Sequence, residues 1–333
     1  MKIRSIVKSL VLTLAIGVQL SSGNSAQAAE DGGYAGAPLQ LGVGGRAVGM
    51  GGAFVAVADG PTGFWYNPAG VGNIRTDQIE AAWRAMSFDR KTGYIAFVHP
   101  FARDEAAMAL SWTYAGVSDL YEYDTDGRRG DQLSNFNNAV TFTFGRRFTP
   151  VLSIGATARY VQQNIGDISA YSIGFDLGVH LKFTRDWDLG GMTLPTSKLQ
   201  LGVVVQRLGQ KYPWTTGEYW VKFGEPGSSF DERFPMIARI GAAANIWQER
   251  AMVSVDAEIN EEEDARIHAG LEILPVSQLA LRAGLDHTEP AFGAGFFLPL
   301  DQNKRSQLVF DYAFAIQPGP IDGEHVFSIG ARF

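Results

Sequence analysis

The feature that most constrains this chain is a long series of segments in which apolar residues alternate with small or polar residues. From Thr76 to the last residue, Phe333, segments of about ten residues repeat this pattern, and turn residues separate them. Strict alternation places two kinds of side chain on opposite faces of a β-strand. The pattern therefore predicts an all-β architecture in which every strand has one apolar face.

The second face of these strands indicates what surrounds them. In the segment 151–161, the apolar face consists of Leu152, Ile154, Ala156, Ala158 and Tyr160. The opposite face consists of Ser153, Gly155, Thr157 and Arg159. A soluble sandwich also alternates and turns its polar face to water. Here the second face combines isolated charges with many glycines, which suits the crowded interior of a barrel better than an open surface.

We expect about fourteen strands of this kind. They lie near 76–86, 92–101, 105–116, 137–148, 151–163, 168–183, 197–207, 234–247, 251–260, 264–274, 277–286, 290–299, 305–316 and 324–333. In lipid every backbone N–H and C=O group needs a partner within the protein, so strands cross a membrane only as a closed barrel. The sequence therefore predicts an antiparallel transmembrane β-barrel of about 14 strands over residues 76–333.

The lengths of the connections predict which end of the barrel faces outward. Outer-membrane barrels have short periplasmic turns and longer external loops. The two longest connections, 117–136 and 208–233, are the third and the seventh in order, so both fall at the same end. Most even-numbered connections are tight, and 184–196 is the exception. A missed strand or a small periplasmic excursion would explain it.

The last segment, 324–333, ends the chain with the aromatic residue Phe333. A terminal Phe on an amphipathic strand looks like the signal that the outer-membrane insertion machinery reads. We therefore expect the barrel assembly machinery and outer-membrane lipid as partners. Aromatic side chains are expected on the lipid-facing surface. These are Phe296, Phe297, Phe310, Tyr312 and Phe314.

The N-terminus has the features of a secretory signal peptide. Basic residues precede an apolar stretch from Leu10 to Leu20, and Ala26-Gln27-Ala28 fits the small-residue cleavage rule. We expect cleavage after about Ala28 and location in the cell outer membrane. Removal of residues 1–28 removes three basic residues and no acidic one, so the net charge changes from -7 to about -10. Such a chain is not expected to bind nucleic acid, which needs a basic face.

The segment 29–75 lies between the signal peptide and the strands, and its stretch 41–71 is rich in Gly and Ala. Gly42-Val43-Gly44-Gly45-Arg46-Ala47 fits the dinucleotide-binding pattern G-x-G-x-x-A. That site also needs a strand before the glycines and a helix after them, and no sustained strand precedes this stretch. We therefore interpret the glycines as backbone that turns tightly inside a narrow lumen.

Three parts of this stretch resemble the N-terminal region of the PorV/PorQ family, within the broader FadL-like outer-membrane proteins. They are Leu41-Gly42-Val43-Gly44-Gly45-Arg46-Ala47, Met50-Gly51-Gly52-Ala53-Phe54-Val55-Ala56 and Tyr66-Asn67-Pro68-Ala69-Gly70. The resemblance implies that 29–75 is a plug, or hatch, inside the barrel. It also implies that Asn67, Pro68 and Ala69 end the hatch and lead into the wall. The alternative is a plain loop before the first strand.

Charged residues on the predicted inner face form the second candidate site. They are Arg159, Asp176, Arg239, Asp256, Glu258, Arg266, Glu272, Arg282, Asp311 and Arg332. Both signs occur, and unpaired buried charges are costly. We therefore expect an ion-pair network that fills the barrel and braces the plug. The alternative is a polar lining that sets what passes.

Aromatic residues in the two long loops form the third candidate site. They are Tyr121, Tyr123, Trp214, Tyr219 and Trp220. Exposed aromatic side chains at this density suggest a capture site for an apolar ligand or a contact for a partner protein. Loops that pack on each other over the barrel mouth are the alternative.

No catalytic or metal-binding motif is recognisable, so we expect neither an enzyme nor a cofactor nor a metal site. The resemblance implies two functions. FadL-like members take up small hydrophobic compounds, and PorV-like members act in type IX protein secretion by binding cargo and the translocon. We favour uptake of hydrophobic molecules and keep secretion, with secreted protein cargo as the partner, as the alternative. Fold alone does not choose between them.

Overall fold

The computed structural model describes most of the chain after residue 33. The described residues are 34–101, 105–183, 187–188, 193–194, 198–221, 224, 226–247, 249–301, 306–317 and 322–333. The predicted signal peptide and the first residues of the predicted hatch therefore lie outside the described residues.

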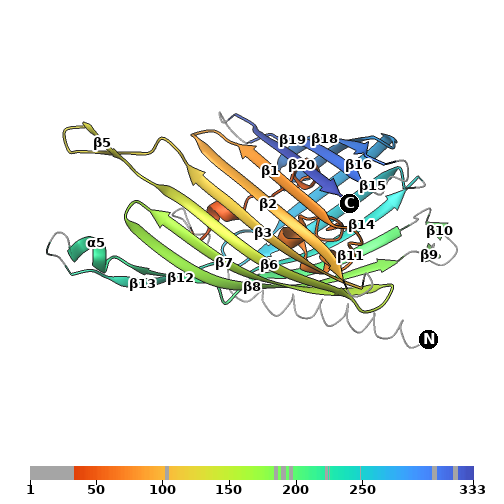
Figure 1. The fold of residues 1–333 in the computed structure, drawn as a ribbon, viewed down its shortest axis with the longest axis horizontal. Helices are drawn as coiled ribbons and strands as arrows, with labels where there is room; N and C mark the ends of the chain where they lie inside the picture. Colours follow the sequence, from red (N-terminus) through yellow and green to blue (C-terminus); the bar gives the residue numbers. More distant parts are fainter. Residues whose placement is uncertain are drawn as a thin grey trace.

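Fourteen of the described strands close into one antiparallel barrel (Figure 1). In order around the wall they are β1 (Gln78–Ala85), β2 (Arg90–Phe101), β3 (Ala106–Val117), β6 (Asn135–Arg147), β7 (Leu152–Ile165), β8 (Ile168–Phe183), β11 (Lys198–Leu208), β14 (Ile237–Ile246), β15 (Ala251–Asn260), β16 (Arg266–Val276), β17 (Leu279–Asp286), β18 (Glu289–Pro299), β19 (Gln307–Ala315) and β20 (Glu324–Arg332). The predicted all-β barrel is confirmed, and every predicted segment overlaps one of these strands.

The first and last strands close the wall. β1 pairs with β20 over its whole length, from Gln78 opposite Arg332 to Ala85 opposite His325. A closed barrel has no unpaired edge, so its backbone groups are satisfied within the wall. No helix among the described residues is long and apolar enough to cross a membrane.

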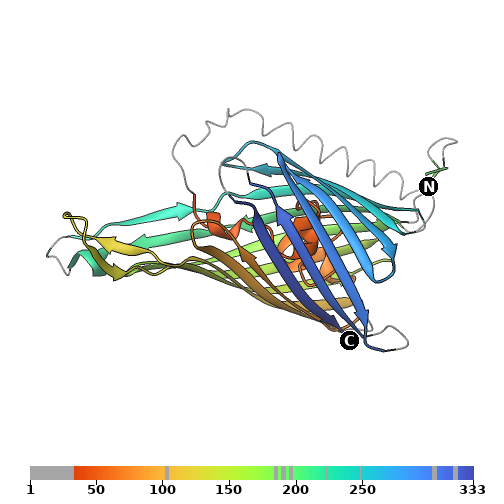
Figure 2. The same ribbon diagram turned by 90° about the horizontal axis from the view of Figure 1, so that it is seen from above.

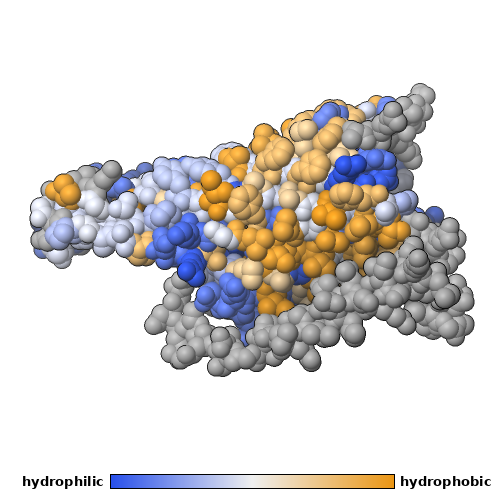
Figure 3. Space-filling model, turned by 90° about the horizontal axis from the view of Figure 1, so that it is seen from below, coloured by the Kyte–Doolittle hydropathy of each residue, from blue (hydrophilic) through white to orange (hydrophobic). Residues whose placement is uncertain are grey.

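The strands turn their polar face inward and their apolar face outward. In β7, Ser153, Thr157 and Arg159 are buried, whereas Ile154 and Tyr160 are 42% and 44% exposed. This is the reverse of a water-soluble barrel, because apolar side chains form the outer belt. Figure 3 shows apolar residues gathered over the barrel and a paler, more polar surface on the parts that project from it.

The prediction that Phe297 faces the lipid was wrong. Phe296 is exposed on the outer face of β18, but its neighbour Phe297 points to the other side. Phe297 lines a small interior cavity with Arg46 and Asp59. Adjacent residues of a strand face opposite ways, so the two rings cannot share the outer surface.

The two long connections form hairpins that project from the same end of the barrel (Figure 1, Figure 2). We call this the hairpin end. The elements are β4 (Tyr121–Tyr123), β5 (Arg129–Gln132), β12 (Lys211–Thr215), α5 (Gly217–Val221) and β13 (Ser229–Arg233). The exceptional connection 184–196 contains a two-stranded sheet, β9 (Trp187–Asp188) and β10 (Thr193–Leu194). It lies at the opposite end, which we call the terminal end because Phe333 ends there (Figure 1).

The described part of the predicted hatch lies inside the barrel (Figure 2). Its short helices are η1 (Ala37–Leu39), α2 (Gly45–Gly49), α3 (Gly63–Tyr66) and α4 (Pro68–Val71). Helix α2 packs on β17 to β20, whereas α4 packs on β3 and on β6 to β8. The segment therefore contacts opposite parts of the wall. β1 begins three residues after residue 75, at Gln78.

Candidate functional site in the barrel interior

Asn67 ties the inner segment to itself and to the wall. Its Oδ1 accepts the N–H of Ala69 at 3.0 Å, which caps α4, and Pro68 occupies the first helical position. Its Nδ2 donates to the carbonyl of Val55 at 2.9 Å and to that of Val179 on β8 at 3.1 Å. The residue is completely buried. Asn67 thus holds two turns of the segment and one wall strand together.

Glycines in the wall let the backbone of the inner segment approach closely. A Cβ atom on Gly155 would overlap the carbonyl of Pro68, and one on Gly178 would overlap the side-chain oxygen of Asn67. A Cβ on Gly202 would likewise overlap the carbonyl of Val55. These glycines belong to β7, β8 and β11. At these three glycines the inner segment therefore lies directly against the backbone of the wall.

Asp256 anchors the middle of the inner segment. Its Oδ2 accepts the N–H of Phe54 at 2.7 Å and the N–H of Val55 at 2.8 Å. Two residues earlier on the same face of β15, Ser254 donates to the carbonyl of Ala53 at 2.7 Å. Hydrogen bonds to a charged acceptor are about twice as strong as neutral ones. The sequence predicted an ion pair for Asp256. In the structure its carboxylate binds backbone N–H groups instead.

A chain of ion pairs links the inner segment to the last strands. Arg46 of α2 binds Glu272 through Nε at 2.8 Å, and Arg282 binds the same carboxylate at 2.7 Å. Arg282 also binds Asp311 at 2.7 Å. The side chains of Arg282, Glu272 and Asp311 are nearly inaccessible to water. Removal of Arg282 would leave Asp311 as a buried carboxylate without its ion-pair partner.

The remaining predicted lumen residues divide into three groups. Arg159 binds Asp176 at 2.8 Å, and Arg239 binds Glu258. Arg332 lines the small cavity near Asp59 at the terminal end. Arg266 does not belong to the interior network: its side chain is 44% exposed and pairs with Glu263 at 2.6 Å. Arg266 is the first residue of β16, so it lies at the rim of the barrel. Its position in the alternating pattern had predicted an inward side chain.

Sequence reasoning missed the role of His180. Its Nε2 lies 2.8 Å from the carbonyl of Ala56, which can only accept, so Nε2 carries the proton. Nδ1 therefore accepts from Asn73 at 3.1 Å, and Ser153 donates to Asn73 at 3.1 Å. The inward parity of Ser153 and His180 was visible in the sequence, but their partners in the inner segment were not. Asp176, on the same strand face, pairs with Arg159 instead.

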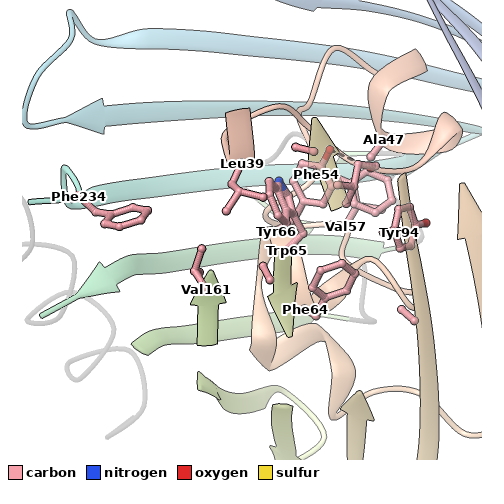
Figure 4. Close-up of a cluster of buried hydrophobic side chains, with 14 of the residues drawn as sticks. Leu39, Ala47, Phe54, Val57, Phe64, Trp65, Tyr66, Tyr94, Val161 and Phe234 are labelled. Carbon is pink, nitrogen blue, oxygen red and sulfur yellow. Dashed lines mark hydrogen bonds between the residues drawn. The ribbon is translucent and has the colours of Figure 1, made fainter. Parts of the chain in front are cut away.

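An apolar cluster runs through the otherwise polar interior (Figure 4). It joins Trp65, Tyr66 and Phe54 of the inner segment to Leu39 and, toward the hairpin end, to Phe234. Burial raises the pKa of the Tyr66 phenol well above its ordinary value. The phenol therefore stays protonated and donates to the carbonyl of Val43 at 3.1 Å.

The four predicted loop aromatics whose side chains are described lie on two different hairpins. Tyr121 stacks under the guanidinium of Arg129 at 3.2 Å, and Tyr123 is 65% exposed on the same hairpin. Trp214 is buried on the other hairpin, packs on Tyr212 and donates to Glu232 at 2.6 Å, so it is not free to capture a ligand. Trp220 is exposed, and the side chain of Tyr219 lies outside the described ones.

The described residues contain no group of three or more His, Asp or Glu side chains that could hold a metal ion. Hydrogen bonds and ion pairs instead join a folded inner segment to the barrel wall. Polar groups of the wall thus hold the segment 34–75, and one apolar cluster crosses the interior.

Comparisons with known proteins find similarity in structure only. No protein-family model and no curated protein sequence matches the chain. The barrel resembles the toluene transporter TodX of Pseudomonas putida, with a TM-score of 0.55 and 12% identity over 87% of this chain and 96% of that one. It also resembles the monoaromatic hydrocarbon channel CymD, with a TM-score of 0.55 and 12% identity over 88% and 97% of the two chains. At this identity the likeness establishes the fold, and the resemblance to the PorV/PorQ family stays a prediction.

Proposed function

We propose that this protein is an outer-membrane channel for the uptake of small hydrophobic compounds. The observation that carries the proposal is the apolar cluster from Phe234 at the hairpin end to Trp65 and Phe54 in the inner segment. Residues of a purely polar pore would not bury a continuous apolar cluster. The likeness in fold to channels for toluene and other monoaromatic hydrocarbons supports the same class of substrate.

In this proposal the inner segment, 34–75, acts as the gate. The polar contacts of Asn67, Asp256 and Glu272 hold it against the wall. A hydrophobic molecule enters at the hairpin end and follows the apolar cluster, where it loses its contact with water. The outward apolar belt supports location in a membrane, and the predicted signal peptide supports export to the outer membrane.

The proposal is tested by uptake of toluene into proteoliposomes, with empty liposomes as the baseline. A charge placed in the apolar cluster by Leu39→Lys is expected to reduce uptake about tenfold or more, because a buried charge is costly. Leu39 is 4% exposed, whereas Leu120 on the hairpin side is 37% exposed, so Leu120→Lys is the matched control. Uptake no faster than in empty liposomes would refute the proposal.

A role in protein secretion predicts a different pattern. Secreted cargo or other barrel subunits would purify with the protein, and a deletion strain would take up hydrophobic compounds normally. Normal uptake of hydrophobic compounds in the deletion strain would contradict uptake as the main function.

A further inference from the structure

A break in strand register near the hairpin end turns one arginine into the barrel. The pairing of β11 with β8 shifts between Val205 and Leu208. Within this bulge Arg207 has φ of 65°, and its backbone N–H donates to Asp176 Oδ1 at 2.9 Å. Bulges re-aim side chains. Here the guanidinium comes within electrostatic reach of Asp176 and Arg159 in the interior.

The two acids within electrostatic reach of Arg207 are already paired with other arginines. Asp176 is already bound by Arg159 at 2.8 Å, and Glu258 is bound by Arg239. Among the described residues Arg207 has no ion-pair partner, and its Nη1 is buried without a hydrogen bond. Arg207 is therefore a positive charge with no ion-pair partner of its own in the described structure. An unpaired buried charge costs several kcal/mol, so this site favours an anion.

Gln210 is a second residue near Arg207 whose side chain lacks hydrogen-bond partners. It is 4% exposed, and neither its Oε1 nor its Nε2 has a hydrogen-bond partner in the described structure. Its amide lies against Gly174, which is the register partner of Arg159 on the neighbouring strand. The Nε of Arg159 is also buried and unpartnered. Buried polar atoms of three side chains thus lack hydrogen-bond partners in one part of the lumen.

Arg207 and Gln210 line a cavity of about 430 Å³ at the hairpin end, which we call the mouth cavity. Its polar lining includes Arg207, Gln210 and Arg233, and its apolar lining includes Phe234 and Met236. A volume in this range holds a small organic ligand. The one acid that lines it, Glu261, already accepts the backbone N–H of Met236 at 2.9 Å.

We propose that the mouth cavity binds the carboxylate of a small monoacid with an apolar body, such as an aromatic acid. Arg207 supplies the counter-charge, since its planar guanidinium matches a carboxylate. Gln210 donates a further hydrogen bond, and Phe234 contacts the apolar body. Apart from Lys211, which binds Asp231, the cavity lining has two arginines and one acid, and this excess of one positive charge corresponds to a monoanion. The inference rests on the proposed uptake function, because it identifies an acid as a substrate of that same route.

The test is calorimetric titration of the full-length, detergent-solubilised protein with benzoate, toluene and inorganic phosphate. Arg207→Gln is expected to weaken benzoate binding at least about tenfold, through loss of a charge-assisted bond. Arg207→Lys should restore part of the affinity. The matched control is Lys198→Gln, which removes the same charge at the terminal end, where Lys198 binds Glu249 at 2.7 Å. Heat-modifiable migration in gels confirms that each variant is folded.

Benzoate affinity that is unchanged in folded Arg207→Gln would overturn the inference. So would phosphate binding as strong as that of benzoate, because the apolar wall would then play no part. Uptake of toluene into proteoliposomes separates this inference from the function on which it rests. If Arg207→Gln loses benzoate binding but still takes up toluene, the result supports the anion site. If the wild type binds benzoate through Arg207 but does not take up toluene, only the proposed hydrocarbon channel is refuted.

Discussion

The contact between Asp256 and the inner segment gives the sharpest quantitative prediction. Asp256→Ala removes two hydrogen bonds from the backbone of Phe54 and Val55 to a carboxylate, at 2.7 and 2.8 Å. Each such bond contributes about 1.5–3 kcal/mol. The variant should therefore lose about 3–6 kcal/mol of docking free energy, which corresponds to roughly 10²–10⁴ in the equilibrium between docked and released segment.

Hydrogen exchange at the amides of Phe54 and Val55 measures this equilibrium directly. Both amides donate to the same oxygen, so Asp256→Asn can keep both bonds and should fall between wild type and Asp256→Ala. The control is Ser254→Ala, which removes one neutral bond to Ala53 on the same strand face. It should cost only about 0.5–1.5 kcal/mol. Equal loss of protection in Asp256→Ala and Ser254→Ala, or no loss in either variant, would refute the reasoning.

Three further predictions follow from the same contacts. Gly178→Val should lower the midpoint of thermal unfolding, because its side chain would overlap Asn67, whereas Ala158→Val on the outer face of the adjacent strand should not. Arg282→Met leaves Glu272 and Asp311 buried with fewer partners and should destabilise by about 3–5 kcal/mol in urea unfolding, while the exposed Arg266→Met should cost less than about 1 kcal/mol. Deletion of residues 34–74 should raise single-channel conductance in planar bilayers, and unchanged conductance would contradict occlusion by this segment.

Much of the barrel was predictable because alternation is a local property. The alternation within one strand was enough to predict that Ser153 faces the interior and Tyr160 faces outward. The failures have equally local causes. Phe297 was assigned to the outer face together with its neighbour Phe296. Arg266 was assigned to the lumen from the alternation alone, although it lies at the end of its strand. Trp214 has an aromatic side chain in a loop, but its burial depends on Tyr212 from the same hairpin.

The sequence by itself determined that the chain forms an antiparallel barrel with an apolar outside, two long hairpins at one end and a Gly-rich segment before the first strand. Only the tertiary structure decided which groups meet inside. Asp256 binds backbone that lies about two hundred residues earlier in the chain, and a bulge turns Arg207 inward. The physical reason is that a period of two fixes which face a side chain takes. Its partner depends on strand tilt, on register and on the path of a segment that has no period.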